Sequence, residues 1–204
     1  MDSKDHHTQV VSVYWNPFRR LKGMRALAIG LVFLVIGSVG SVFGEVRYPG
    51  IFTWQYVESV HWLSGFFDQI LGILIAVVVF YLIAYIFGAR KIHILNMTGG
   101  FLVARGPIVF LPFLNFNGWL YGVSENLIEV GMEGEELPGF GESVVMVLVS
   151  ILLLLCFVWT ISLLFSAYRE STRLRGIPSL ISFILGIIVS LILTGWMIPD
   201  YYFG

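Results

Sequence analysis

The sequence predicts an all-α integral membrane protein, a bundle of five transmembrane helices that forms a single domain over residues 1–204. The first observation is composition, because 57% of the residues are hydrophobic and only 12% are charged. A soluble chain usually carries about 25% charged residues. The second observation is order, because five long apolar runs alternate with polar segments. So much apolar surface cannot be buried in one small aqueous core, and lipid is therefore the expected solvent.

The polar segments alternate in charge, and this alternation sets the expected orientation. Every Lys and Arg except Arg47 lies in residues 1–25, 88–105 or 166–176, whereas most Asp and Glu residues lie in 45–69 and 124–143. Positively charged loops stay in the cytoplasm, so the N-terminus is expected to be cytoplasmic and the C-terminus external. Removing one span would carry the basic segment 166–176 to the external side. Charge therefore predicts five spans independently of hydropathy.

Four of the apolar runs have the length that a bilayer requires, which is about 20 residues. The expected spans are 26–44, 66–87, 144–165 and 177–198. The third run, 106–123, is interrupted by Pro107 and Pro112, so the third helix is expected to be short and Pro-broken. Its Asn115 and Asn117 are unfavourable in hydrocarbon and should face other helices or water, where they could line a path for a solute.

An interfacial helix is expected on the external side, between the first and second spans. Residues 51–69 are aromatic and nearly uncharged, too polar to span a membrane and too apolar to float free of it. Helical spacing joins five apolar residues: Phe52, Tyr56, Val60, Leu63 and Phe67. His61 is expected to be a polar contact at headgroup level rather than a metal ligand, because no Cys or second His lies within ligand spacing.

Small residues at intervals of four predict close helix packing in two of the spans. The last run carries Ser182, Gly186, Ser190 and Thr194 on one face, and the first run carries the pairs Gly37/Ser41 and Gly40/Gly44. We expect both helices to pack inside the bundle or against another protomer. The simpler alternative is that Gly and Ser are common in spanning helices in general.

The basic segments are the expected binding surface for lipids or for a partner protein. A base near an anionic leaflet contributes about 1 kcal/mol, although an ordinary positive-inside anchor is the simpler interpretation of residues 1–25. Arg105 is either a snorkelling anchor or a buried functional cation. The candidate residues are Arg19, Arg20, Lys22, Arg90, Lys91 and Arg105.

The sequence contains no motif for catalysis or for metal or phosphate binding. It lacks His-Glu-x-x-His, Gly-x-x-x-x-Gly-Lys and Gly-x-Ser-x-Gly. No ionisable residue lies at the predicted centre of a span, which argues against ion-coupled transport. The Glu-rich segment 124–143 lacks the Asp pattern of a calcium loop and should be solvated. We therefore expect no cofactor, no metal and no nucleic-acid partner.

Three short motifs carry a resemblance to a known family. They are Asn16-Pro17-Phe18 before the first helix, Gly88-Ala89-Arg90-Lys91 after the second, and Gly99-Gly100 with Ala104-Arg105-Gly106-Pro107 around the start of the third. Over residues 15–200 the chain resembles the Ypt-interacting-protein (Yip) family in its short bacterial form. The resemblance implies a bacterial inner-membrane protein. Eukaryotic members bind small GTPases and shape or sort membranes, but their long N-terminal domain has no counterpart here.

The expected function is that of a non-enzymatic Yip-like membrane scaffold or organiser, whose partners are membrane lipids, a second copy or another membrane protein. The alternative is a small-solute transporter or a membrane subunit of one, and a lipid-modifying enzyme comes third. A cavity that reaches Asn115 would favour transport, and an exposed Ser182/Gly186/Ser190 face would favour helix association. A headgroup-sized pocket formed by Arg90, His93 and Arg105 would favour lipid chemistry.

Overall fold

The computed structural model describes residues 17–57, 60–118, 120 and 140–198, and these residues are mostly helical. Four helices are long and apolar enough to cross a membrane: α2 (Met24–Phe43), α3 (Trp62–Ile86), α7 (Phe140–Thr172) and α8 (Ile177–Met197). A fifth crossing is available if α4 (Ile94–Ala104) and the segment that follows it act as one span bent by 41°. Four to five helices of this length and hydropathy indicate an integral membrane protein.

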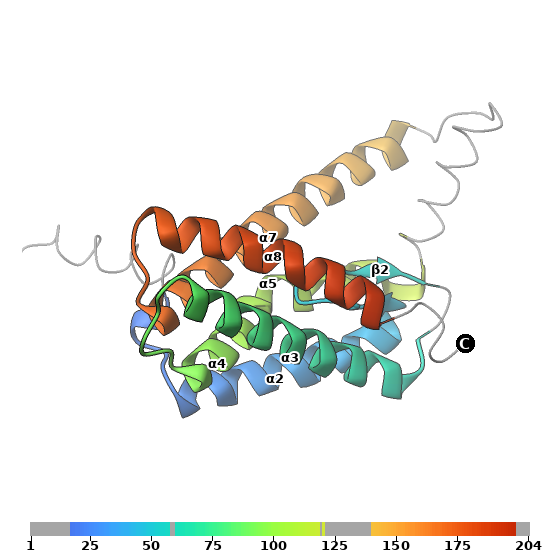
Figure 1. The fold of residues 1–204 in the computed structure, drawn as a ribbon. Coiled ribbons are helices and arrows are strands. Elements are labelled where there is room, and N and C mark those ends of the chain that lie inside the picture. Colours follow the sequence, from blue (N-terminus) through green and yellow to red (C-terminus); the bar gives the residue numbers. More distant parts are fainter. Residues whose placement is uncertain (1–16, 58–59, 119, 121–139, 199–204) are drawn as a thin grey trace, which may run out of the picture.

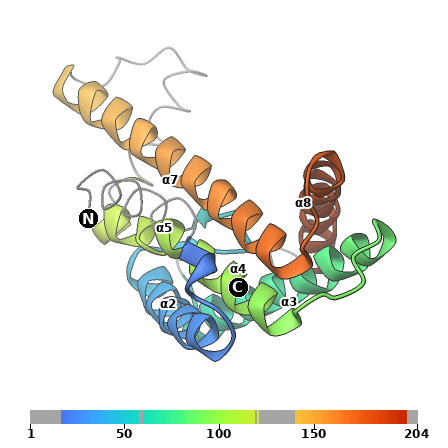
Figure 2. The ribbon, with the colours of Figure 1, turned by 90° about the vertical axis from the view of Figure 1, so that its left-hand side faces the viewer.

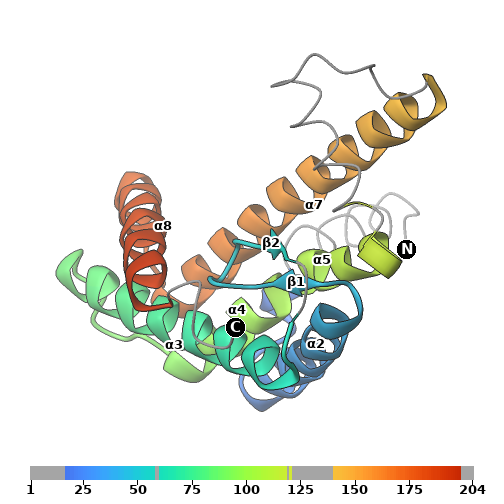
Figure 3. The same cartoon turned by 90° about the vertical axis from the view of Figure 1, so that its right-hand side faces the viewer.

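The first, second and last helices begin and end within a few residues of the expected positions. The fourth is longer than expected, because α7 has 33 residues and continues through Arg169 into the basic segment. α8 packs along α3, α2 lies beside α4, and the C-terminal half of α7 crosses α4. In Figures 1 to 3 the N-terminal half of α7 points away from the other helices.

The helix that could open a third crossing begins at Ile94 and not at Gly106, so the prediction of a span over 106–123 is wrong at its start. After α4 the chain continues through α5 (Gly106–Val109) and the 3-10 helix η2 (Leu111–Gly118), while residues 121–123 lie outside the described residues. The charge pattern places Gly99-Gly100 in the polar segment 88–105. Instead each glycine faces a neighbouring helix: a Cβ on Gly99 would lie 2.6 Å from the Leu27 nitrogen, and one on Gly100 would lie 2.8 Å from Ala167 Cβ. These glycines let α4 fit between α2 and α7.

Four glycines spaced by seven residues let α2 pack closely against the segment from α4 to η2 along the whole length of α2. The N–H of Gly23 donates to Asn96 Oδ1 at 2.7 Å, at the start of both helices. A Cβ on Gly37 would lie 3.3 Å from Val109 Cγ2, and one on Gly44 would lie 2.6 Å from Pro112 Cα. Gly30 lies between them, against α4. The segment from α4 to η2 therefore runs parallel to α2 from one end of the bundle to the other.

The prediction of an interfacial helix over 51–69 is wrong, because among the described residues 51–57 and 60–69 only those from Trp62 onward are helical, as the first turns of α3. Upstream lies an antiparallel hairpin of β1 (Val46–Arg47) and β2 (Gln55–Tyr56), in which Val46 pairs with Tyr56. Its connection is buried: Tyr48, Ile51 and Phe52 are at most 5% exposed. Figure 3 shows this hairpin beside α7 and α8. Tyr48 and Phe52 therefore lie in the interior of the bundle, whereas Trp62, Phe66 and Phe67 of α3 are exposed. Helical spacing alone does not distinguish an aromatic segment on the bilayer surface from one buried in protein.

An aromatic cluster joins four helices at the centre of the core. The ring of Phe80 on α3 lies 5.1 Å from Phe101 on α4, 5.4 Å from Tyr168 on α7 and 5.5 Å from Phe183 on α8, measured between centroids. These edge-on and tilted arrangements are those that aromatic pairs prefer. The cluster fixes the C-terminal part of α7 against α3, α4 and α8. It thereby positions the end of α7 next to the starts of α4 and α8.

Candidate functional site: a basic cavity

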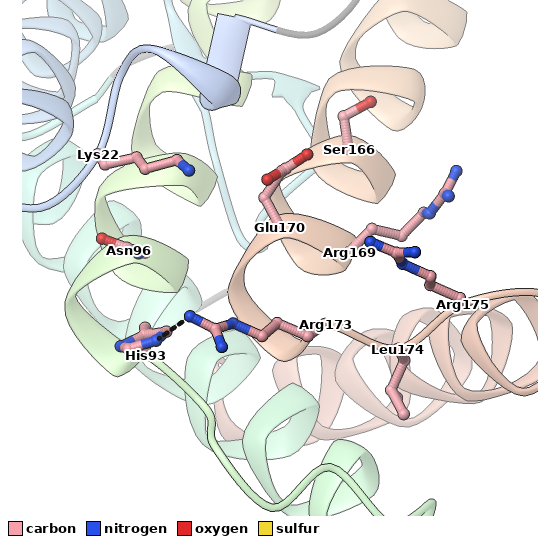
Figure 4. A pocket seen from close by; sticks show the side chains of 9 residues that line it. All are labelled: Lys22, His93, Asn96, Ser166, Arg169, Glu170, Arg173, Leu174 and Arg175. Carbon is pink, nitrogen blue, oxygen red and sulfur yellow. Dashed lines mark hydrogen bonds between the residues drawn. The ribbon is translucent and has the colours of Figure 1, made fainter.

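A cavity of about 830 Å³ lies at the end of the bundle where α2, α4 and α8 begin and α7 ends, at the left of Figure 1. Four of the side chains around it are Lys or Arg and one is acidic. We call it the basic cavity (Figure 4), and its lining residues are Lys22, His93, Asn96, Ser166, Arg169, Glu170, Arg173, Leu174 and Arg175.

One wall of the basic cavity is formed by the starts of α2 and α4. Asn96 accepts the Gly23 N–H through Oδ1, and Gly23 has a φ of +58°, a conformation that glycine adopts without strain. This turn places Lys22 beside the first turn of α4. The backbone N–H of His93 donates to the Ser171 carbonyl at 3.1 Å, which ties the start of α4 to the end of α7.

The opposite wall is formed by the end of α7 and its connection to α8. Arg173 directly follows α7 and has a φ of +60°, which is unusual for a residue other than glycine. Its N–H still donates to the Arg169 carbonyl at 2.9 Å. From there its side chain reaches across the cavity, and Nη2 lies 3.4 Å from His93 Nε2 (Figure 4). The guanidinium of Arg169 lies over the Phe165 ring at 5.5 Å from the centroid, and Arg175 is exposed.

The arrangement can bind an anion, since Lys supplies a compact point charge and Arg a planar fork of donors. Among the described residues there is no group of three His, Cys, Asp or Glu side chains that could hold a metal ion. The pair formed by Arg173 and His93 joins two walls that come from distant parts of the sequence. The geometry is that of a receptor for negative charge at the boundary of the bundle.

The sequence identified only part of this site. Lys22 lines the basic cavity, whereas Arg20, Arg90 and Lys91 do not, although all four side chains are exposed. The side chain of Arg19 lies outside the described residues. Arg169, Arg173 and Arg175 of the basic segment 166–176 line the cavity but are not among the candidate residues that the sequence predicts. Their charge was the available signal, and the pocket expected from His93 with Arg90 and Arg105 is formed by His93 with other bases.

Arg105 lies elsewhere, inside the bundle between α4 and α5. It is 2% exposed, and its guanidinium lies over the ring of Tyr48 at 5.2 Å from the centroid. Its Nε and Nη1 have no hydrogen-bond partner among the described residues. Tyr48 itself donates to the Ile108 carbonyl at 3.1 Å, and burial raises the pKa of its hydroxyl although the nearby Arg105 lowers it. The geometry is that of a buried cation and not of a side chain that snorkels to water.

Asn115 and Asn117 are the two residues that the sequence suggests could line a path for a solute. Asn115 is buried, and its Nδ2 donates to the Gly44 carbonyl at 2.7 Å, which fastens η2 to the end of α2. Among the described residues, Asn115 lines neither the basic cavity nor the apolar groove lined by Val39 of α2 and Phe66 of α3. The side chain of Asn117 lies outside the described residues.

The small residues face other helices of the same chain. On α8, Ser182 accepts from the Tyr168 hydroxyl at 2.8 Å, Gly186 lies against Phe80, and Ser190 and Thr194 are buried. On α2, Gly37, Gly40 and Gly44 face Gln69, Phe113 and Pro112, and Ser41 is buried beside Gly65. The Ser182/Gly186/Ser190 face is therefore not an exposed surface.

Comparisons of the chain with models of protein families, with curated proteins and with solved structures find no match.

Proposed function

We propose that the protein is a non-enzymatic, Yip-like membrane organiser that binds the headgroup of an anionic lipid in the basic cavity. The observation that carries the proposal is the convergence of Lys22, Arg169, Arg173 and Arg175, from segments far apart in the sequence, around one cavity with a single acid, Glu170. Keeping four bases together costs electrostatic energy, and bound negative charge removes that cost.

A lipid suits this site better than a soluble metabolite, because the cavity lies beside apolar helix surfaces. Leu174 lines it, and α8 starts next to it with Ile177, Leu180 and Ile181 at least 46% exposed. A lipid could place its phosphate among the bases and its acyl chains along α8. The bases also occupy the end of the bundle that charge sorting predicts to be cytoplasmic, where anionic lipids are enriched.

Native mass spectrometry of the full chain, released from detergent in the presence of one lipid at a time, tests the proposal. We expect phosphatidylglycerol to be retained and phosphatidylcholine not to be. Lys22→Gln and Arg173→Gln should each weaken retention several-fold, while Arg90→Gln, which removes an exposed base outside the cavity, should not. Equal weakening by all three variants would show that net charge and not the cavity attracts the lipid. A thermal melt of each variant checks that it remains folded.

A further inference from the structure

The bases of the basic cavity form two groups on opposite walls. Lys22 and the tip of Arg173, which is held 3.4 Å from His93, belong to the wall made by α2 and α4. Arg169 and Arg175 belong to the wall made by α7 and its connection to α8 (Figure 4). Each wall therefore offers two bases, with Glu170 beside those of the α7 wall, and Asn96 adds a side-chain amide to the first wall.

The charge balance calls for more than one phosphate. Four bases and one acid, Glu170, leave an excess of three positive charges when His93 is neutral. One phosphodiester carries a single negative charge and would leave one wall of the cavity without a counter-charge. Two phosphates on one headgroup would give each wall its own partner. A volume of about 830 Å³ is at the upper end of the usual range for ligand sites and accommodates such a headgroup.

The geometry points to a lipid headgroup with two phosphates as the ligand, one phosphate between Lys22 and Arg173 and the other between Arg169 and Arg175. This inference rests on the proposed function, because it names the class of lipid that the same cavity binds. The cavity is bounded by helices with exposed apolar flanks, so the several acyl chains of such a lipid have surface to lie on. Basic pockets of this kind between membrane helices are known to suit headgroups of high charge.

The test compares diphosphatidylglycerol (cardiolipin), phosphatidylglycerol and the deacylated diphosphate headgroup, at equal phosphate concentration, with the full chain in native mass spectrometry. We expect diphosphatidylglycerol to be retained at a concentration at least about tenfold lower than phosphatidylglycerol, because its second phosphate binds intramolecularly. Lys22→Gln and Arg175→Gln, one from each wall, should each weaken retention of both lipids, but that of diphosphatidylglycerol by the larger factor, so that the preference is lost. Lys91→Gln, an exposed base outside the cavity, should preserve the preference.

Equal retention of the two lipids at equal phosphate would overturn the two-phosphate inference and leave the proposed lipid site intact. Retention of neither lipid would overturn both. Binding of the deacylated headgroup as tightly as the intact lipid would also overturn the inference, since the ligand would then be a soluble diphosphate. Loss of the preference in Lys91→Gln would assign it to overall charge. Thermal melts of the variants separate loss of binding from loss of fold.

Discussion

Arg47 of β1 donates two hydrogen bonds to a single carboxylate oxygen of Asp68 in α3, from Nε at 3.0 Å and from Nη2 at 2.8 Å. Both residues are less than 10% exposed. The pair fastens the hairpin to the wall of the bundle. A buried ion pair of this kind is stable only as a pair, since either charge alone would lack the water that it gave up on folding.

Removing one partner of this pair should destabilise the protein. Asp68→Leu removes the carboxylate that accepts two hydrogen bonds from the buried Arg47 guanidinium, and we expect a loss of about 3 kcal/mol in the free energy of unfolding. Arg47→Met together with Asp68→Leu should recover much of that loss. Chemical denaturation in detergent measures both, with Arg90→Met as the exposed control. A single variant as stable as the parent would contradict the assignment.

The contact between Gly186 and Phe80 gives a second prediction. A Cβ on Gly186 would lie 2.6 Å from Phe80 Cδ1, and that ring is held by the aromatic cluster, so it has little room to move. Gly186→Leu should lower the free energy of unfolding by about 1–3 kcal/mol.

Gly195→Leu is the matched control for this substitution. It introduces the same side chain on the same helix, at a position where no heavy atom of the described residues lies within 4 Å of the added Cβ. Its stability should remain close to that of the parent. Thermal melts of the two variants decide the matter, and similar stability of both would show that α8 does not depend on this close approach.

Arg105 gives a prediction of opposite sign. Its buried Nε and Nη1 lack hydrogen-bond partners among the described residues, and the contact with the Tyr48 ring offsets only part of the lost hydration. Arg105→Met keeps much of the side-chain volume and removes the charge, so we expect the free energy of unfolding to rise by about 1–3 kcal/mol. Lys91→Met, at an exposed position, serves as the control. A clear loss of stability in Arg105→Met would mean that a partner holds the guanidinium.

The orientation predicted from charge is open to a direct test. With five crossings, a tag at the N-terminus should be protected from external protease in spheroplasts and a tag at the C-terminus should be cleaved. Opening the membrane should then expose both tags. Equal accessibility of the two tags before opening would show an even number of crossings, and the segment from α4 to η2 would then not span the bilayer.

The sequence predicted those elements whose signal is hydropathy alone. α2, α3 and α8 each contain a run of about 18 or more residues without a charge, which is long enough to predict a spanning helix. The start of the third crossing was not predictable in this way, because Gly99 and Gly100 can mark either a loop or a close helix contact. Their neighbours Leu27 and Ala167 are distant in sequence, so only the packed structure distinguishes these cases.

The hairpin was missed for a related reason. Phe52 and Tyr56 fit a helix that lies on the bilayer as well as they fit strands buried in protein, since both environments accept aromatic side chains. The sequence predicted that positive charge gathers at one end of the bundle, but it did not predict which basic residues line the basic cavity. Charge sorting located the bases at one end, but whether Lys22, Arg90 or Arg175 lines a common cavity depends on how α4 packs against α2 and α7.

The burial of the hairpin also bears on how the chain is made. Residues 46–56 leave the ribosome well before two of the helices that they contact, since Trp54 meets Phe157 on α7, at 6.0 Å between ring centroids, and Gly50 lies beside Thr194 on α8. Until the last helix is inserted, this stretch has no complete set of neighbours. The interior of the bundle can therefore be completed only after α8 has been inserted into the membrane. A nascent chain that stops before α8 leaves residues 46–56 without some of their contacts, and such incompletely packed chains are prone to misfolding.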